Sequence, residues 1–521
     1  MKEMKDTFYI TTPIYYVNDE PHLGHAYTTI LADALARFAR LRGNDVFFLT
    51  GTDEHGQKVQ TAAQERGIDE RTHADQMVVR FRDLWADLHI EHSDFIRTVE
   101  PRHVDVVRHI LQQLWDAGEI YRDEYEGWYC VPDERFWTEK DLVDDNCPDC
   151  GRPVQRLTEQ NYFFRMSAYQ DWLIAYINDN PSFIQPETRR NEVLGYLQQP
   201  LRDLCISRPK SRLSWGIPLP FDEEYVTYVW FDALLNYITA PGYLSDRDRF
   251  DRFWPHVMHL VGKDILTTHC VYWPTMLKAA GIAPPRTILA HGWWVMQGTK
   301  MSKSRGNVVK PLDLARIYGV DAFRYFLLRE MTLGRDADFS EEGLVQRYSS
   351  ELANDLGNLL HRVVNMIGRY CEGRIPAPEA PKVSSTILRE QCQVTVSRVM
   401  SQVEQLRLNE ALGNIMGCVN KINSYLEETA PWSLAKQKGR QTEVNNVLYT
   451  AAESLRIASV LLWPVMPERM SELWARLGWS PSGSLRDGLR WGGLETGAPV
   501  TAGPPLFSKD IIQERLEQVP A

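Results

Sequence analysis

The sequence predicts an α/β protein in which a doubly wound parallel sheet carries an insertion and is followed by an all-helical domain. Residues 7 to about 115 alternate short apolar runs, rich in β-branched and aromatic residues, with stretches whose apolar residues recur at helical spacing. A turn-rich, acidic stretch interrupts this alternation from about 116 to 227. From about 346 onward the helical spacing continues almost throughout, as expected for a helical bundle.

The first strand-to-helix turn carries the first motif. An apolar run at residues 8–12 precedes it, and a helix is expected to begin at His22-Leu23-Gly24-His25. A helix start offers backbone N–H groups and the positive end of a dipole, beyond the carboxyl ends of the strands where ligands of such sheets bind. Gly24 permits a close approach of the backbone, and His22 and His25 can project to the same side. The turn therefore predicts a phosphate-binding site.

The stretch from 116 to 227 contains a pattern typical of a metal knuckle. Cys130 and Asp133, and Cys147 and Cys150, form two pairs with the spacing of a four-ligand zinc site. A carboxylate can ligate zinc, but structural sites usually close with sulfur and nitrogen. Two alternatives stay open: zinc held by three thiolates and Asp133, or a knuckle that has lost its metal and keeps its shape through hydrogen bonds. The ligand preference favours the second.

A second motif follows the expected return of the sheet at residues 226–230 and 256–261. Lys300-Met301-Ser302-Lys303-Ser304 lies in a loop bracketed by glycines and rich in cations and hydroxyls, which suit polyphosphate. Glycines at both ends of a loop are consistent with closure over a nucleotide and reopening. Neither motif is convincing alone, but their order in one chain indicates a nucleotide site.

The C-terminal third is expected to form an up-and-down helical bundle. Apolar residues form one stripe over residues 352–363 and another over 448–462. Residues 374–381 contain three prolines and are therefore expected to form a loop between helices.

Composition limits the class of protein. The chain has 521 residues, a net charge of −11 and eight cysteines, with no apolar N-terminal region or long apolar stretch. We therefore expect a cytoplasmic protein with reduced thiols and no membrane partner. The negative charge argues mildly against general nucleic-acid binding. It does not exclude RNA, because local basic side chains such as Arg324 and Arg329 can steer it.

The two motifs resemble the signatures of the class I aminoacyl-tRNA synthetases, and the methionyl family among them. The resemblance is collinear and covers residues 13–18, 51–56, 228–237, 262–265, 291–293, 358–362 and 430–432. It implies a Rossmann-type catalytic domain in two halves (1–115 and 228–290), a connective-peptide insertion (116–227), a stem-contact region with the lysine-bearing loop (291–345) and a helical-bundle anticodon-binding domain (346–521).

The resemblance implies ATP-dependent attachment of methionine to its tRNA, both initiator and elongator. The methionine carboxylate attacks the α-phosphate of ATP to form methionyl-adenylate and pyrophosphate, a step that depends on positioning and charge stabilisation. His22, Gly24 and His25 are expected to bind ATP, which carries Mg²⁺. Lys300 and Lys303 are expected to neutralise the leaving pyrophosphate, with Lys303 dominant.

The same resemblance implies an apolar, aromatic pocket for the thioether. Asp53 is expected to pair with the substrate ammonium. Tyr16 and His269 are expected to offer weak polar contacts to the sulfur. Leu234 stands where some family members have proline. The expected pocket residues are Ile14, Tyr16, Asp53, Trp230, Ala233, Leu234, Tyr237, Ile265 and His269.

Anticodon reading is expected at Asn358, Arg362 and Trp432, because unpaired bases are recognised by aromatic stacking and by hydrogen bonds to their edges. Two rival functions remain: another class I synthetase for an apolar amino acid, or a non-catalytic RNA-binding relative. The short insertion disfavours the first and the intact phosphate motifs disfavour the second. Dimeric relatives carry an additional C-terminal domain that nothing in this sequence resembles, so a monomer is expected.

Overall fold

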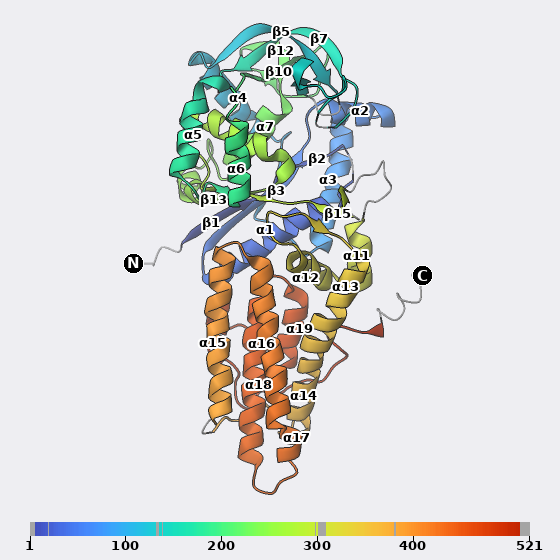
Figure 1. Ribbon diagram of the computed structural model, residues 1–521, viewed down its shortest axis with the longest axis vertical. Coiled ribbons are helices and arrows are strands. Elements are labelled where there is room, and N and C mark those ends of the chain that lie inside the picture. Colours follow the sequence, from blue (N-terminus) through green and yellow to red (C-terminus); the bar gives the residue numbers. More distant parts are fainter. Residues whose placement is uncertain are drawn as a thin grey trace.

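A seven-stranded parallel sheet forms the middle of the molecule (Figure 1). The computed structural model describes residues 6–18, 20–131, 135–137, 139–148, 150–296, 298–300, 309–379 and 382–510. The strand order is β2-β3-β1-β13-β14-β8, with β4 paired to β3, and every pair is parallel. The strands are β1 (Thr7–Thr11), β2 (Tyr15–Tyr16), β3 (Asp45–Asp53), β4 (Asp94–Arg97), β8 (Ile184–Gln185), β13 (Val257–Gly262) and β14 (Thr287–His291).

Helices cover both faces of this sheet, as its alternating side chains require. Ile10 of β1 lies in one hydrophobic core with residues of α1 and α3, whereas its neighbour Tyr9 lies in another core with residues of α4 and α10. The doubly wound prediction is therefore confirmed. The helices of this part are α1 (Leu23–Arg42), α2 (Gln57–Arg66), α3 (Glu70–Asp87), α4 (Pro101–Asp116), α7 (Val229–Leu234), α8 (Asn236–Thr239), α9 (Arg247–Phe253) and α10 (Trp273–Ala279).

Two antiparallel sheets form the end of the molecule farthest from the bundle (Figure 1). One has the order β6-β5-β7-β9 and the other β10-β12-β11. Their strands are β5 (Ile120–Cys130), β6 (Arg135–Trp137), β7 (Gln155–Phe164), β9 (Leu204–Cys205), β10 (Ser207–Pro209), β11 (Pro218–Leu219) and β12 (Asp222–Thr227). Helices α5 (Gln170–Asp179) and α6 (Glu187–Tyr196) lie between β7 and β9 in the chain.

The expected return of the parallel sheet at residues 226–230 is wrong. This run ends β12, which pairs antiparallel with β10 and β11, and then enters α7. The first half of β12 is acidic and largely exposed, which suits an antiparallel strand with one face in solvent rather than a strand covered on both faces. The return at 256–261 is confirmed as β13, and the stretch from 116 to 227 also supplies β8 to the parallel sheet.

The chain then reaches the helical domain through β15 (Trp294–Met296), β16 (Thr299–Lys300), α11 (Pro311–Tyr318), α12 (Val320–Glu330), β17 (Ala337–Asp338) and α13 (Glu341–Arg347). The bundle contains a π-helical segment, η7 (Tyr348–Gly357), followed by α14 (Asn358–Tyr370), α15 (Val383–Glu404), α16 (Leu408–Thr429), α17 (Pro431–Leu434), α18 (Gln441–Leu462) and α19 (Pro467–Arg476). The predicted loop at 374–381 is confirmed over its described residues 374–379. Among the described helices, none combines the length and apolar character needed to span a membrane.

Gly51 of β3 marks a close approach between β3 and β4. A Cβ atom at this position would lie 2.0 Å from the carbonyl oxygen of Ile96 and 2.8 Å from its Cγ2. Gly51→Ala should therefore lower the melting temperature by several degrees, since overpacking costs about 1–3 kcal/mol or more. Gly195→Ala in α6 is the matched control, because a Cβ there meets no atom within 4 Å. Equal melting temperatures for both variants would contradict the close packing of β3 on β4.

Candidate active site

The two histidines of the first motif cap helix α1. The His22 Nδ1 atom accepts a hydrogen bond from the Gly24 N–H at 3.0 Å, and the His25 Nδ1 atom accepts one from the His22 N–H at 3.2 Å. The rings stack with centroids 3.8 Å apart. Because both Nδ1 atoms accept, each neutral ring carries its proton on Nε2, the atom that can donate to a phosphate oxygen.

The surroundings of His25 keep its ring neutral. Burial, and then the neighbouring His22, hold the pKa of His25 well below 6.5. The ring centroid lies 4.8 Å from that of Tyr15. At Gly24 a Cβ atom would lie 3.0 Å from the His22 Cε1 atom, so the absence of a side chain lets the His22 ring fold over the first turn. Glycine at this position therefore leaves room for the imidazole of His22.

A hydrogen bond joins α1 to the segment that leads into the second motif. The Thr28 Oγ1 atom in α1 lies 2.8 Å from the Nε2 atom of His291, the last residue of β14. From β14 the chain passes into β15, which pairs with β16 through Val295 and Lys300. The backbone of Lys300 therefore lies near the carboxyl edge of the parallel sheet, on the side where α1 begins. Lys303 lies outside the described residues.

The expected methionine residues come from several elements at this same edge. Tyr16 of β2 pairs in register with Asp53, the buried last residue of β3. The Tyr237 hydroxyl lies 2.8 Å from the His269 Nε2 atom, and the Trp230 ring lies 6.4 Å from the His269 ring. The remaining members lie near them in the chain: Ile14 before β2, Ala233 and Leu234 in α7, and Ile265 at the end of a 3₁₀ turn, Lys263–Ile265.

Both ring nitrogens of His269 already have partners. The Nδ1–H donates to the Ile265 carbonyl at 3.0 Å, so the Nε2 atom accepts from the Tyr237 hydroxyl. Burial lowers the pKa of His269 to about 4, which keeps this arrangement at neutral pH. His269 is therefore arranged to orient Tyr237, and a direct N–H contact from His269 to a sulfur atom would break one of these bonds.

A buried carboxylate beside the expected pocket was missed in the sequence. Asp232 of α7 accepts hydrogen bonds from His55 Nδ1 at 2.6 Å and from His103 Nε2 at 2.7 Å. Burial raises the pKa of Asp232, but the two histidines outweigh it and hold the pKa below 3.8. His55 and Asp232 both stand in the runs that carried the resemblance. His103 had no sequence signal, since its partner is 129 residues away.

Three cysteines of the knuckle lie together. The sulfur atoms of Cys130, Cys147 and Cys150 are all within 4.8 Å of one another, and those of Cys130 and Cys150 are 3.5 Å apart. Asp133, the expected fourth ligand, lies outside the described residues. The described donors therefore match three of the four expected ligands.

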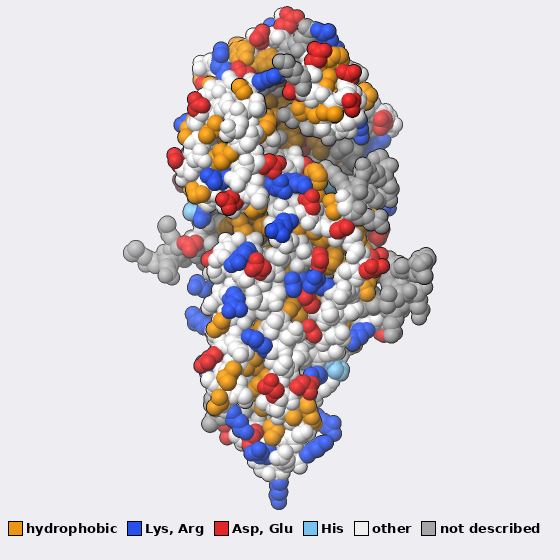
Figure 2. All heavy atoms as spheres, in the orientation of Figure 1, with side chains coloured by type: hydrophobic (Ala, Val, Ile, Leu, Met, Phe, Trp, Pro, Cys, Tyr) orange, Lys and Arg blue, Asp and Glu red, His pale blue; other side chains and the backbone are white. Residues whose placement is uncertain are grey.

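Two of the three expected anticodon residues are in contact at the far end of the bundle. The Arg362 guanidinium lies 5.6 Å from the centroid of the Trp432 ring, and it forms an ion pair with Glu427 at 2.7 Å. Asn358 lies exposed one turn before Arg362 on α14. Lys and Arg side chains gather at this tip, beside the loop from α17 to α18 (Figure 2). By contrast, Arg324 is fully buried, so its expected role in steering RNA is wrong.

Two family models identify the class of proteins to which this chain belongs. A family model described as "tRNA synthetases class I (M)" matches residues 8–158 and 151–364, and one described as "Anticodon-binding domain of tRNA ligase" matches residues 386–487. Together with the parallel sheet, these matches define a class I aminoacyl-tRNA synthetase.

Close relatives identify the family within the class. The methionine–tRNA ligases of Caldanaerobacter subterraneus and Clostridium tetani are 48% and 46% identical to this chain, over 98% and 99% of it and 80% of each relative. A structure of Mycobacterium tuberculosis methionyl-tRNA synthetase with methionyl-adenylate matches with a TM-score of 0.93 and 40% identity, over 97% of this chain and 100% of that one. The chain belongs to the methionyl-tRNA synthetase family. It attaches methionine to tRNA in an ATP-dependent reaction through methionyl-adenylate, releasing pyrophosphate and AMP.

The Asp232 cluster predicts a loss of stability in Asp232→Asn. An amide cannot accept from both imidazole N–H groups, and a buried donor without a partner costs about 1–3 kcal/mol. The melting temperature at neutral pH should therefore fall. Because the folded-state pKa of Asp232 is depressed, its contribution is present at neutral pH and is lost as the pH falls through that pKa, below 3.8. The difference between wild type and variant should shrink accordingly in acid.

Asp251→Asn provides the control for this measurement, since Asp251 forms an exposed ion pair with Arg247. A melting temperature for Asp232→Asn equal to that of the control would contradict the role given to the cluster.

Proposed function

We propose that methionyl-adenylate forms at the carboxyl edge of the parallel sheet, between the first turn of α1 and the lysine-bearing loop. His22 and His25 would donate from Nε2 to the phosphates of ATP, and Gly24 would let the nucleotide approach the backbone. Lys300 and Lys303 would neutralise the leaving pyrophosphate. The hydrogen bond between Thr28 and His291 supports this proposal, because it holds the two parts of the chain that carry the motifs against each other.

Charge stabilisation is the main demand of this step. The methionine carboxylate is already ionised, so the attack on the α-phosphate needs no general base, and negative charge develops on the pyrophosphate. Neutral imidazoles suit the α1 side because they donate hydrogen bonds without attracting the substrate carboxylate into an ion pair. Mg²⁺ is the proposed companion of the ATP phosphates, and the lysines would share its role in charge neutralisation.

Asp53 is proposed to bind the ammonium group of methionine. Its carboxylate is buried at the end of β3, beside Tyr16 and within the electrostatic influence of Tyr237. A buried carboxylate favours a cation over a neutral ligand. The apolar set Ile14, Trp230, Ala233, Leu234 and Ile265, with Tyr237 held by His269, is proposed to surround the thioether.

Asp53→Asn should weaken methionine binding by about a hundredfold or more and leave ATP binding unchanged. The substitution keeps the shape but removes the charge, and a buried ion pair that loses one partner costs on the order of 3–5 kcal/mol. Isothermal titration with each substrate measures both effects. Asp45→Asn, at the other end of β3 and paired with Arg252, is the control. Unchanged methionine affinity in Asp53→Asn would rule out the assignment.

The anticodon is proposed to bind at the tip of the bundle, on Asn358, Arg362 and Trp432. The contact of Arg362 with Trp432 supports this site, because an arginine beside an aromatic ring can sandwich and hydrogen-bond an unpaired base. Initiator and elongator methionine tRNAs are both proposed substrates, since both decode methionine. The five-part division of the chain, a monomeric state and a cytoplasmic location also stay predictions.

Trp432→Ala should impair charging of methionine tRNA sharply while methionine-dependent pyrophosphate exchange without tRNA stays near wild type. Base–aromatic stacking contributes about 1–3 kcal/mol per base, so a loss of roughly 5- to 150-fold in kcat/KM for tRNA is expected. Trp491→Ala is a matched control, because Trp491 is also half-buried and has an arginine, Arg389, 5.6 Å from its ring. Parallel losses in both assays, together with a lower melting temperature, would mean that Trp432 only supports the fold.

The knuckle is proposed to hold zinc only if a fourth ligand completes it. Three cysteine sulfurs within 4.8 Å of one another fit three corners of a zinc tetrahedron. Asp133 would be the fourth ligand, and its carboxylate is the unusual member of the set. Metal analysis of the purified protein distinguishes a zinc-bearing knuckle from one that has lost its metal.

A further inference from the structure

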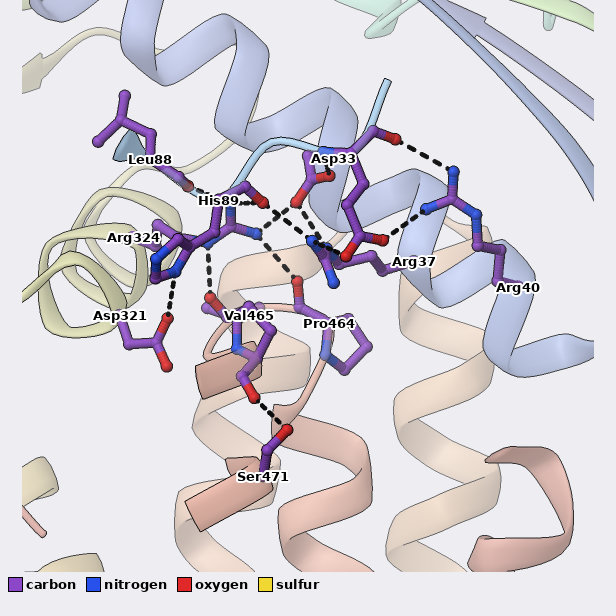
Figure 3. Close-up of polar contacts among 12 residues, drawn as sticks. Asp33, Arg37, Arg40, Leu88, His89, Asp321, Arg324, Pro464, Val465 and Ser471 are labelled. Carbon is purple, nitrogen blue, oxygen red and sulfur yellow. Dashed lines mark hydrogen bonds and ion pairs between the residues drawn. The ribbon is translucent and has the colours of Figure 1, made fainter. Parts of the chain in front are cut away.

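A buried network of charges joins the catalytic half of the molecule to the bundle (Figure 3). Its centre is Arg324 of α12, whose side chain is fully buried. The Arg324 Nη2 atom lies 2.6 Å from the Oδ2 atom of Asp33, which is also fully buried and belongs to α1. Within the described residues, its other hydrogen bonds are to backbone carbonyls, so this guanidinium links separate segments in addition to forming an ion pair.

Arg324 reaches both the catalytic half and the bundle. On the catalytic side the Nη1 atom donates to the Leu88 carbonyl at 3.0 Å, just after α3. On the bundle side the Nε atom donates to the Val465 carbonyl at 2.9 Å and the Nη2 atom to the Pro464 carbonyl at 3.2 Å, in the turn between α18 and α19. Its planar fork suits this task, because it fixes the directions of several donors at once.

Asp33, the ion-pair partner of Arg324, also accepts hydrogen bonds from other groups. Its Oδ2 atom also accepts from Arg37 Nε at 2.8 Å, and its Oδ1 atom accepts from the Glu91 N–H at 2.9 Å. Burial raises the pKa of Asp33. Arg324 and Arg37 lower this pKa by more than burial raises it, so the pKa lies below its usual value and the carboxylate stays ionised. The Arg37 guanidinium also lies 5.1 Å from the ring of Trp463, which follows α18. Helix α1 thus contacts the bundle turn directly through Arg37, and Asp33 of α1 is linked to the same turn by Arg324 of α12.

A second contact from α12 fixes the orientation of α19. The Asp321 Oδ2 atom accepts from the Arg469 N–H at 2.7 Å, in the first turn of α19, where a carboxylate is favoured. Asp321 also lies 3.8 Å from His89, whose pKa this contact raises. The turn from Trp463 to Arg469 therefore contacts α1 through Arg37 and α12 through Arg324 and Asp321.

We infer that Arg324 and Asp33 are positioning residues that set the orientation of the anticodon bundle relative to the adenylate site. A tRNA that contacts the tip of the bundle and the catalytic edge at once is bound at two places. The second contact then depends on the effective concentration that the protein geometry provides. Helix α1 begins at the proposed ATP-binding histidines and also carries Asp33. The junction therefore fixes the position of the bundle relative to the proposed adenylate site. This inference rests on the proposed position of the anticodon.

Arg324→Lys tests the inference, because lysine keeps the charge but cannot donate to Asp33 and to the carbonyls of Leu88, Pro464 and Val465 in fixed directions. We expect kcat/KM for charging full-length methionine tRNA to fall about tenfold, within the hundredfold that a misplacement of 1 Å can cost. Methionine-dependent pyrophosphate exchange without tRNA should stay within about twofold of wild type. Charging of an acceptor-stem minihelix, which cannot reach the bundle tip, should be unchanged as well. Asp33→Asn should show the same selective loss.

Arg456→Lys is the matched control for burial and stability. Arg456 is also fully buried, pairs with Glu453, and donates to the carbonyl of Arg490 at 2.8 Å, but all these contacts lie within the helical domain. Arg456→Lys should lower the melting temperature without a selective loss of full-length tRNA charging.

Two results would overturn the inference. One is an equal loss of full-length and minihelix charging in Arg324→Lys and Asp33→Asn. The other is full-length charging that stays within about twofold of wild type in both variants. A failure of the proposed anticodon position is a separate outcome, because full-length charging in Trp432→Ala would then either stay intact or fall in parallel with pyrophosphate exchange.

Discussion

The capping of α1 by its own histidines is the interaction on which the proposed ATP site depends. A helix start next to a parallel sheet offers an anion site in many proteins, but here the cap is made by the same side chains that are proposed to bind ATP. The backbone N–H groups of His22 and Gly24 fix both Nδ1 atoms as acceptors and thereby determine where the ring protons lie. The hydrogen bonds that cap the helix therefore also fix the proton positions on the two rings that are proposed to bind ATP.

Neutral histidines recur throughout this edge. Burial lowers the pKa values of His25, His259, His269 and His291, and each of these rings has its proton position set by a neighbour. His291, for example, donates from Nδ1 to the Gly292 carbonyl and so presents Nε2 to Thr28 as an acceptor. The formal charges of the proposed site are then left to Asp53 and the lysines. Binding that depends on neutral imidazoles varies little with pH near 7.

The sequence predicted the features that depend on local periodicity and spacing. The first strand and helix, the strand at 256–261, the bundle and its proline-rich loop all have signals within a few turns of chain. The strand at 226–230 was placed in the wrong sheet because a short apolar run does not specify its pairing partner. The burial of Arg324 could not be predicted, since its acceptors at Asp33 and Leu88 are more than 200 residues away. The Asp232 cluster was missed for the same reason: it joins three distant segments.

The central pairing of the parallel sheet has a consequence for how the chain is made. Strand β1 is flanked by β3 on one side and by β13 on the other, and Tyr9 of β1 lies in register with Val257. At a synthesis rate of about 5–20 residues per second, β13 leaves the ribosome roughly 12–50 s after β1. During that interval β1 has an open edge, which is a template for unwanted strand pairing. Nascent chains of this protein therefore need protection from aggregation until more than half of the sequence has been translated.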